Sequence, residues 1–579
     1  MRRCLLGLAL VAALAFILLA CHVSQPSPTP APAPVSATDT RVKLATQTSC
    51  DNRVPPLGTQ FPEGFDYPQT STTVQSWVNN PNGDGGRTRL HAYCVFWGLN
   101  QPVRGSDIPT WRTWGTATQA FPNQYNTWLG SNTGSGTLEA KPVTINESRS
   151  QAQGKLGAIR NPQPIYYVNQ AIVDNLQYRP CLQPPFSKTN QNYKLRDGQV
   201  FQSNGDIMIA AVSYNQPALK NILRVSSLYD APTLNRQLPA EAESPSRSIA
   251  PFPDDSIVLK VMLWPVNGGG STWNAVTALP IWDWNANAPG SPSDGKYAGY
   301  EVQKFWTKAV AISSGPRPQA PGPQRVQFLY GVLNADGSPL GPNTYDNAQV
   351  VGLDRFYTLK FSDAEFAALS PCDRAILDAS AYWAYNRAFQ SIDSLALIAM
   401  HVMTKEQSDW TFQSAWWHPD AFACNGANAR FCGNQPGIIS GLDKTYKNYM
   451  MSTTYGMLQR TRHPNYYAPL DSQKPPKVWP VAYNPYIELA ASHPITTNCM
   501  NCHHRAAWPP DTPKTKPYKK RFSAYLQDSP ANPNPLEFFT TDNGVFDGLL
   551  MVDSMWAVSD RAGYPASGTD ATPTAANAP

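Results

Sequence analysis

The sequence is poor in charge. Only 15% of its 579 residues are Asp, Glu, Lys or Arg, against about a quarter in ordinary soluble domains. The 46 basic and 41 acidic residues nearly balance, so the formal net charge is only +5. This balance leaves no sequence-wide electrostatic case for nucleic acid binding. The composition also excludes coiled coils and acidic disordered chains.

The common hydrolase and nucleotide signatures are missing as well. The chain contains no Gly-x-Ser-x-Gly elbow, no Gly-Lys-Ser/Thr phosphate loop and no His-Glu-x-x-His. It has no internal repeat of 20–50 residues, which argues against propellers and solenoids. Proline is abundant, with 55 residues, and aromatic residues make up 11%. These features favour a loop-rich globular protein with ample apolar mass for a core.

The first twenty residues have the features of an export signal. Two arginines precede the apolar run Leu5–Leu19, which is shorter than the roughly 20 residues of a membrane span. The run ends in Leu18-Leu19-Ala20-Cys21, which resembles the lipobox of bacterial lipoproteins. The resemblance implies cleavage before Cys21 and acylation of that residue, which would anchor the protein to a lipid bilayer. Because His22 follows, the outer membrane is favoured; an uncleaved anchor or an ordinary signal peptide are the alternatives.

Cysteine usage agrees with export to an oxidising compartment. Six of the ten cysteines remain after the signal, the lipidated residue and the motif described below are set aside. An even number permits three disulfides in an exported protein. We predict the pair Cys424–Cys432, which closes the short loop CNGANARFC. A set of free buried thiols is the alternative.

The most informative motif is Cys499-Met500-Asn501-Cys502-His503. Cys-x-x-Cys-His is the attachment signature of c-type haem. Two thiols at this spacing add to the haem vinyl groups, and the adjacent imidazole lies under the porphyrin as an iron ligand. Two other interpretations use the same residues: a zinc site and a thioredoxin-like redox disulfide. No second spaced pair supports zinc, and no strand-then-helix pattern supports the disulfide.

The sequence thus resembles the c-type cytochromes, specifically large bacterial proteins with a single motif near the C-terminus. The resemblance covers only a few residues. It implies one covalent haem on Cys499 and Cys502, with His503 as the proximal iron ligand. It implies no particular reaction.

The sixth iron ligand decides between electron transfer and chemistry at an open iron. Three candidates are Met551, Met555 and His401. The two methionines lie in Phe546–Val558, which we predict to be an amphipathic helix where such residues also fill cores. His401 follows the apolar stretch Leu395–Met400, a predicted buried strand, where a core hydrogen bond is the alternative role.

The remaining pattern predicts an α+β fold with a β-rich, loop-rich main body and a smaller C-terminal segment that carries the haem. Strands are expected at Ser256–Leu263, Tyr300–Phe305 and Val326–Leu333, a half-buried strand at Trp410–Trp417, and helices from Ser370 to Phe389 and around residues 165–176. The expected regions are a signal peptide (1–20), a lipidated Cys and Pro-rich stalk (21–40), the main body (41–480), the haem segment (481–566) and a disordered tail (567–579).

Three functions are compatible with this sequence. The first is a membrane-anchored c-type cytochrome of the bacterial cell envelope that carries electrons to a redox partner protein, with its body facing the periplasm or the surface. A basic cluster between Lys514 and Arg521 is a candidate docking element for an acidic redox partner or for anionic lipid head groups; a solvated loop is the alternative. The second is a haem peroxidase or oxygenase with an open iron site, since the body is larger than electron relay requires. The third is a haem-bearing binding or sensor lipoprotein.

Overall fold

The computed structural model describes part of the chain. The described residues are 68–78, 85–100, 108–123, 166–167, 194–195, 209–269, 276–282, 306–315, 322–328, 343–369, 371–421, 444–455, 484–487, 499, 503–512, 522–523 and 546–564.

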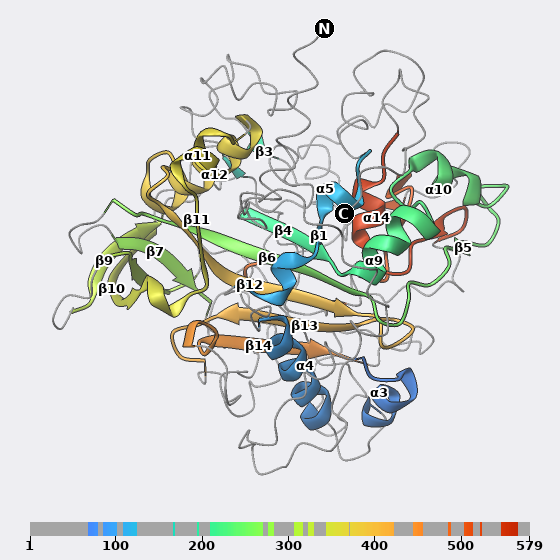
Figure 1. The fold of residues 1–579 in the computed structure, drawn as a ribbon, viewed down its shortest axis with the longest axis horizontal. Helices are drawn as coiled ribbons and strands as arrows, with labels where there is room; N and C mark the ends of the chain where they lie inside the picture. Colours follow the sequence, from blue (N-terminus) through green and yellow to red (C-terminus); the bar gives the residue numbers. More distant parts are fainter. Residues whose placement is uncertain are drawn as a thin grey trace, which may run out of the picture.

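A seven-stranded antiparallel sheet crosses the middle of the molecule (Figure 1). Its longest strand reads SLALIAMHVMT and is buried along its whole length, as a continuous apolar run predicts. The strand order is β1 (Gly115–Thr116), β4 (Ile209–Tyr214), β6 (Ile257–Val266), β12 (Ser394–Thr404), β13 (Thr411–Trp417) and β14 (Tyr449–Thr454), with β11 (Thr358–Lys360) also paired to β12.

A second sheet of four strands lies at one end of the first (Figure 1). Its order is β7 (Val276–Ile281), β8 (Lys308–Ser313), β10 (Asn343–Gly352) and β9 (Gln324–Phe328), and only the β8–β10 pair is parallel. Three small sheets complete the described strands: β15 (Ala507–Trp508), β18 (Leu550–Met551) and β5 (Arg247–Ser248); β16 (Asp511–Thr512) with β17 (Phe522–Ser523); and β2 (Tyr166–Tyr167) with β3 (Lys194–Leu195).

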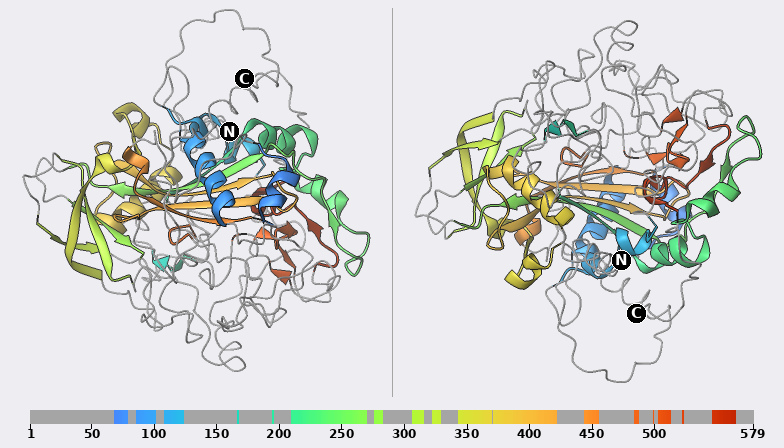
Figure 2. Two further views of the ribbon diagram at one scale, coloured as in Figure 1. Left: turned by 90° about the horizontal axis from the view of Figure 1, so that it is seen from below. Right: turned by 90° about the horizontal axis from the view of Figure 1, so that it is seen from above.

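Short helices gather in three places around the central sheet (Figures 1 and 2). Two lie near β14: α3 (Ser71–Val78) and α4 (Gly85–Leu99). Two lie beside the four-stranded sheet: α11 (Asp363–Ala367) and α12 (Pro371–Tyr385). At the other end lie α5 (Ala117–Ala120), α9 (Gln216–Lys220) with the π-helix η3 (Asn221–Val225), α10 (Ala231–Gln237) and α14 (Trp556–Arg561). The 3₁₀ turns are η1 (Thr110–Thr113), η6 (Leu353–Arg355) and η9 (Lys444–Tyr446).

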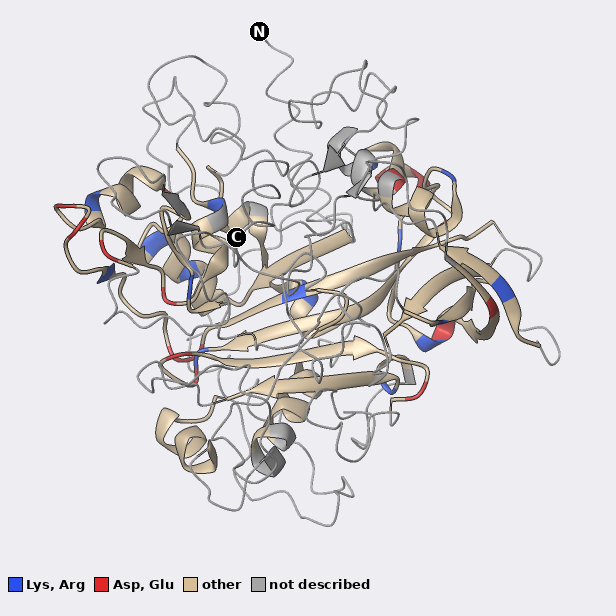
Figure 3. Cartoon of the chain, turned by 180° about the vertical axis from the view of Figure 1, so that it is seen from behind, with Lys and Arg blue, Asp and Glu red and all other residues tan. Residues whose placement is uncertain are grey.

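Charged residues are sparse on the seven-stranded sheet and more frequent on the four-stranded sheet and in the peripheral helices and turns (Figure 3). Within the described residues, no helix combines the length and the apolar character that crossing a bilayer requires.

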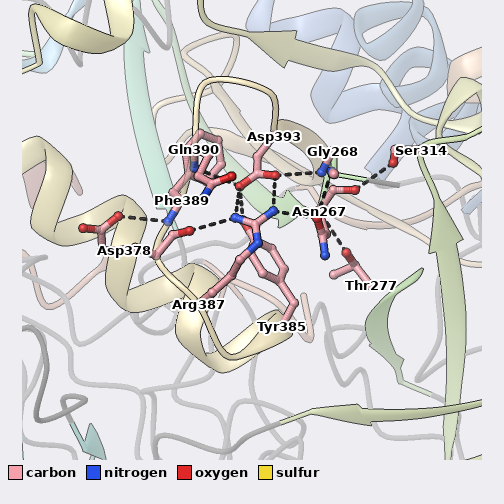
Figure 4. A network of polar contacts seen from close by, with 12 residues as sticks. Asn267, Gly268, Thr277, Ser314, Asp378, Tyr385, Arg387, Phe389, Gln390 and Asp393 are labelled. Carbon is pink, nitrogen blue, oxygen red and sulfur yellow. Dashed lines mark hydrogen bonds and ion pairs between the residues drawn. The ribbon is translucent and has the colours of Figure 1, made fainter. Parts of the chain in front are cut away.

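One buried carboxylate connects the end of α12 to the end of β6 in the central sheet (Figure 4). Asp393, which is fully buried just before β12, accepts a bidentate pair of hydrogen bonds from Arg387 at 2.7 Å each and another from the Tyr385 hydroxyl at 2.9 Å. It also accepts the backbone N–H of Gly268, which follows β6, at 2.7 Å. A Cβ atom at Gly268 would lie 1.8 Å from the carbonyl oxygen of Ile392, so only glycine fits this close approach.

The predicted α+β class is confirmed, and so are several elements. β6 and β12 occupy the predicted strands Ser256–Leu263 and Leu395–Met400, and β9 covers the start of Val326–Leu333. Helix α12 begins after Ser370 as expected but ends at Tyr385, because Asn386 adopts a left-handed conformation with φ 58°. The predicted strand Tyr300–Phe305 lies outside the described residues.

Three local predictions are wrong. Strand β13 is fully buried, not half-buried: the side chains on both of its faces are covered. Tyr166 and Tyr167, inside a predicted helix, form strand β2. Phe546–Val558 is not one amphipathic helix: it contains a turn, strand β18, a second turn and only then α14.

Candidate functional site

His401 lies in the middle of β12, directly opposite Ser414 of β13 and Lys260 of β6. Its Nδ1 atom is 3.2 Å from the Ser414 hydroxyl, which also accepts a hydrogen bond from the Asn484 amide at 3.0 Å. Its other ring nitrogen, Nε2, is buried and has no hydrogen-bond partner among the described residues. Burial, the neighbouring His503 and Lys260 all lower the pKa of His401 well below 6.5. The ring is therefore neutral at pH 7.

His503 lies close to the turn that follows β18. Its Nδ1 atom is 2.8 Å from the backbone carbonyl oxygen of Ser554. Because a carbonyl oxygen only accepts hydrogen bonds, Nδ1 carries the proton and Nε2 carries the lone pair. Burial lowers the pKa of His503 to about 4, although the Ser554 hydrogen bond acts in the opposite direction. This imidazole is thus held neutral, in the tautomer that leaves Nε2 available to a metal.

The two imidazole rings lie close together although 102 positions separate them in the chain. Their ring centroids are 5.7 Å apart and their planes differ by 22°. Phe412 of β13 packs against both, with centroid distances of 4.8 Å to His503 and 5.5 Å to His401. The Cys499 sulfur lies 4.0 Å from His401 Nδ1, and Cys499 is buried and not disulfide-bonded. One residue of the predicted attachment pair therefore lies at the same place as both histidines.

A tight turn, Val552–Met555, presents the Ser554 carbonyl to His503. The Met555 N–H donates to the Val552 carbonyl at 2.9 Å, and both central residues are left-handed, with φ 51° at Asp553 and 60° at Ser554. These features define a type I′ turn built from two residues other than glycine. Aspartate and serine tolerate such turns better than most residues do, but the conformation still costs free energy.

The other predicted ligands lie on either side of this turn. Met551 pairs with Ala507 across β18 and β15 and packs in a small cluster with Phe546 and Leu549. Met555 is buried in a larger cluster that includes Cys499 and Phe412. Cys502 lies outside the described residues, as do Cys21, Cys424, Cys432 and the basic cluster. Cys94 of α4 is disulfide-bonded.

Three residues of this site could not be predicted from the sequence. Ser554 acts through its backbone, which no side-chain motif reveals. Phe412 and Ser414 are ordinary strand residues that only the β12–β13 register places beside His401. The one available signal was the dipeptide Asp553-Ser554, a frequent turn former inside the predicted helix.

A second buried polar group connects the helices near β14 to the central sheet. His91 of α4 lies 2.8 Å from the Tyr455 hydroxyl through Nδ1 and 3.1 Å from the Glu406 carboxylate through Nε2. Glu406 is buried and also accepts the backbone N–H of Gln69 and the Thr404 hydroxyl. These contacts fasten the N-terminal helices to the sheet.

Within the described residues, no three His, Cys, Asp or Glu side chains are grouped so as to hold a metal ion by themselves. A haem iron needs fewer protein ligands, because the porphyrin supplies four ligands and the protein only one or two. His401 and His503 are two imidazoles that lie close together in this part of the structure.

Comparison with known proteins gives no family assignment. No family model matches the chain, and no curated protein and no solved structure matches it either.

Proposed function

We propose that this protein is a c-type cytochrome that carries single electrons in the bacterial cell envelope. Cys499 and Cys502 would hold one covalent haem, and His503 and His401 would be its two axial ligands. The observation that carries the proposal is the pairing of two neutral imidazoles, the buried His401 and the half-buried His503, whose ring centroids are 5.7 Å apart, next to a cysteine of a Cys-x-x-Cys-His motif.

The residues present fit a haem iron in two respects. His503 has its Nδ1 proton directed at a backbone carbonyl, the arrangement that fixes the ring and raises the basicity of a metal-binding histidine. His401 keeps a buried ring nitrogen without a hydrogen-bond partner, and burying such an atom costs free energy unless a ligand compensates for it. A metal bond at Nε2 would compensate, with Nδ1 donating to Ser414.

The same geometry favours His401 over the two methionines as the sixth ligand. Ser554 lies on the Nδ1 side of the His503 ring, away from its metal-binding nitrogen. Met555 follows Ser554 directly, and Met551 packs with Phe546 and Leu549 in a separate cluster. His401 instead lies beside the His503 ring and belongs to β12 of the central sheet. We therefore assign Met551 and Met555 to core packing.

When bound, a haem supplies a one-electron couple of its iron. The chain contributes the environment: Phe412 and the strand residues around it exclude water, and burial keeps both imidazoles uncharged. His503 and His401 would both hold the iron, which would favour electron transfer over reactions at an open iron.

The proposed location follows from the sequence. The lipobox-like segment would leave Cys21 acylated, and the Pro-rich stalk would hold the body away from the bilayer. The disulfide at Cys94 supports an oxidising compartment. A redox partner protein would exchange electrons with the haem; the basic cluster from Lys514 to Arg521 is the docking element we propose.

Covalent attachment tests this function directly. The full chain is produced in a bacterium that exports and matures c-type cytochromes, then unfolded and extracted with acidified acetone. We expect the haem to stay with the polypeptide, and the double variant Cys499→Ala/Cys502→Ala to lose it. Replacing His504, the neighbouring histidine, by Gln is the matched control and should leave attachment unchanged. Recovery of a haem-free wild-type protein, with or without zinc, would refute the proposal.

A further inference from the structure

The turn that holds His503 is fixed from outside by a buried ion pair. The Lys405 ammonium lies 2.7 Å from Asp553 Oδ1, and the two side chains are only 3% and 15% exposed. The second carboxylate oxygen of Asp553 accepts the backbone N–H of Phe252 at 2.9 Å. The backbone carbonyl of Asp553 accepts the Trp410 indole N–H at 2.8 Å. Both the side chain and the main chain of one left-handed residue are thus held.

Lys405 is itself anchored to the sheet that carries His401. It follows the last residue of β12, and its backbone N–H donates to Ser256 at 3.0 Å, just before β6. Its ammonium also donates to the Ser408 carbonyl and lies 5.3 Å from the Trp410 ring. The strand that carries one histidine therefore reaches, four residues later, the turn that holds the other.

From these contacts we propose that Lys405 is a positioning residue for the proximal haem ligand. By pairing with Asp553 it keeps the Val552–Met555 turn left-handed, so that the Ser554 carbonyl faces His503 Nδ1. This inference rests on the proposed function, because it assigns a role toward the haem to residues that do not touch it.

The consequence for the haem follows from the hydrogen bond. A carbonyl acceptor at Nδ1 makes the imidazole a stronger donor to iron, which favours the ferric state. Without Lys405, Asp553 loses its counter-charge, and a turn of two non-glycine residues with positive φ relaxes toward ordinary backbone conformations. The Ser554 carbonyl then turns away from His503. The midpoint potential rises, and the orientation of the ring becomes heterogeneous.

The test uses the full-length haem protein and the variant Lys405→Met. The matched control is Lys360→Met, which removes an exposed lysine on β11. We expect Lys405→Met to show a more positive midpoint potential and broadened low-spin EPR signals, and the control to match wild type. Lys405→Arg, which restores the charge, should return the potential toward the wild-type value. Hydrogen exchange should speed up at the Met555 amide, which closes the turn.

In Lys405→Met the Asp553 carboxylate is buried without its counter-charge. If this prevents folding, a second variant keeps the test decisive. The double variant Lys405→Met/Asp553→Asn leaves no unpaired charge, so its stability should recover. Its midpoint potential should remain shifted, because the Lys405–Asp553 ion pair is absent. A wild-type potential and spectrum in this folded double variant would overturn the inference. A wild-type protein without haem would instead refute the proposed function, so the two failures are distinguishable.

Discussion

The neutral state of His503 predicts how stability depends on pH. We consider the haem-free variant Cys499→Ala/Cys502→Ala, in which the imidazoles are free to titrate. Burial lowers the pKa of His503 from 6.5 to about 4 in the folded protein. Between these two values the unfolded chain binds more protons than the folded one, so the free energy of unfolding decreases as the pH falls below 6.5.

The size of the effect follows from the same shift. For a folded pKa of about 4 and an unfolded pKa of 6.5, linkage predicts that His503 alone removes about 2 kcal/mol between pH 8 and pH 5. The residue is partly exposed, which reduces the expectation to about 1–2 kcal/mol. His401 contributes in the same direction, because burial lowers its pKa as well.

Urea unfolding at pH 8 and pH 5 measures this difference. The comparison variant is His503→Asn in the same background, since an asparagine amide can still donate to the Ser554 carbonyl but does not titrate. We expect the loss of stability between the two pH values to be smaller in this variant by about 1–2 kcal/mol. An equal loss with and without His503 would show that this ring is not held neutral by burial.

Three further predictions concern ligation and folding. His401→Ala should convert the ferric haem protein from low spin to high spin and allow cyanide and carbon monoxide to bind, as seen by absorption spectroscopy; an unchanged spectrum would exclude His401 as a ligand. Asp393→Asn should lower the free energy of unfolding by about 3–5 kcal/mol in a chemical denaturation, because it leaves Arg387 without its buried partner. Arg325→Met breaks an ion pair whose side chains are 69% and 73% exposed and should change stability by less than about 1 kcal/mol.

Long apolar strands could be predicted from the sequence because their pattern is local. β6 and β12 are nearly uninterrupted apolar runs, and a run of that length and composition has few alternatives to a buried strand. The Phe546–Val558 segment shows the opposite case. Its apolar spacing suits a helix, but Asp553 gains hydrogen bonds from Lys405, Phe252 and Trp410 that exist only in the folded turn. Tertiary contacts therefore override the local preference.

The residues of the candidate site also differ in how far the sequence predicts them. Cys499 and His503 could be found because their spacing is part of the motif itself. His401 was one of several candidates, since nothing in its neighbours along the chain indicates which residue faces it. Its place opposite His503 depends on the register of β12 against β13 and on the path of the C-terminal segment. Long-range packing of this kind leaves no pattern in a single sequence.

The central claim is that His503 and His401 fill both axial positions of a covalent haem. The most direct measurement is the absorption and EPR spectrum of the purified full-length protein, ferric and ferrous, with and without cyanide and carbon monoxide. We predict low-spin iron whose spectrum neither ligand changes. High-spin iron that shifts when either ligand is added would contradict it and would indicate an open iron site.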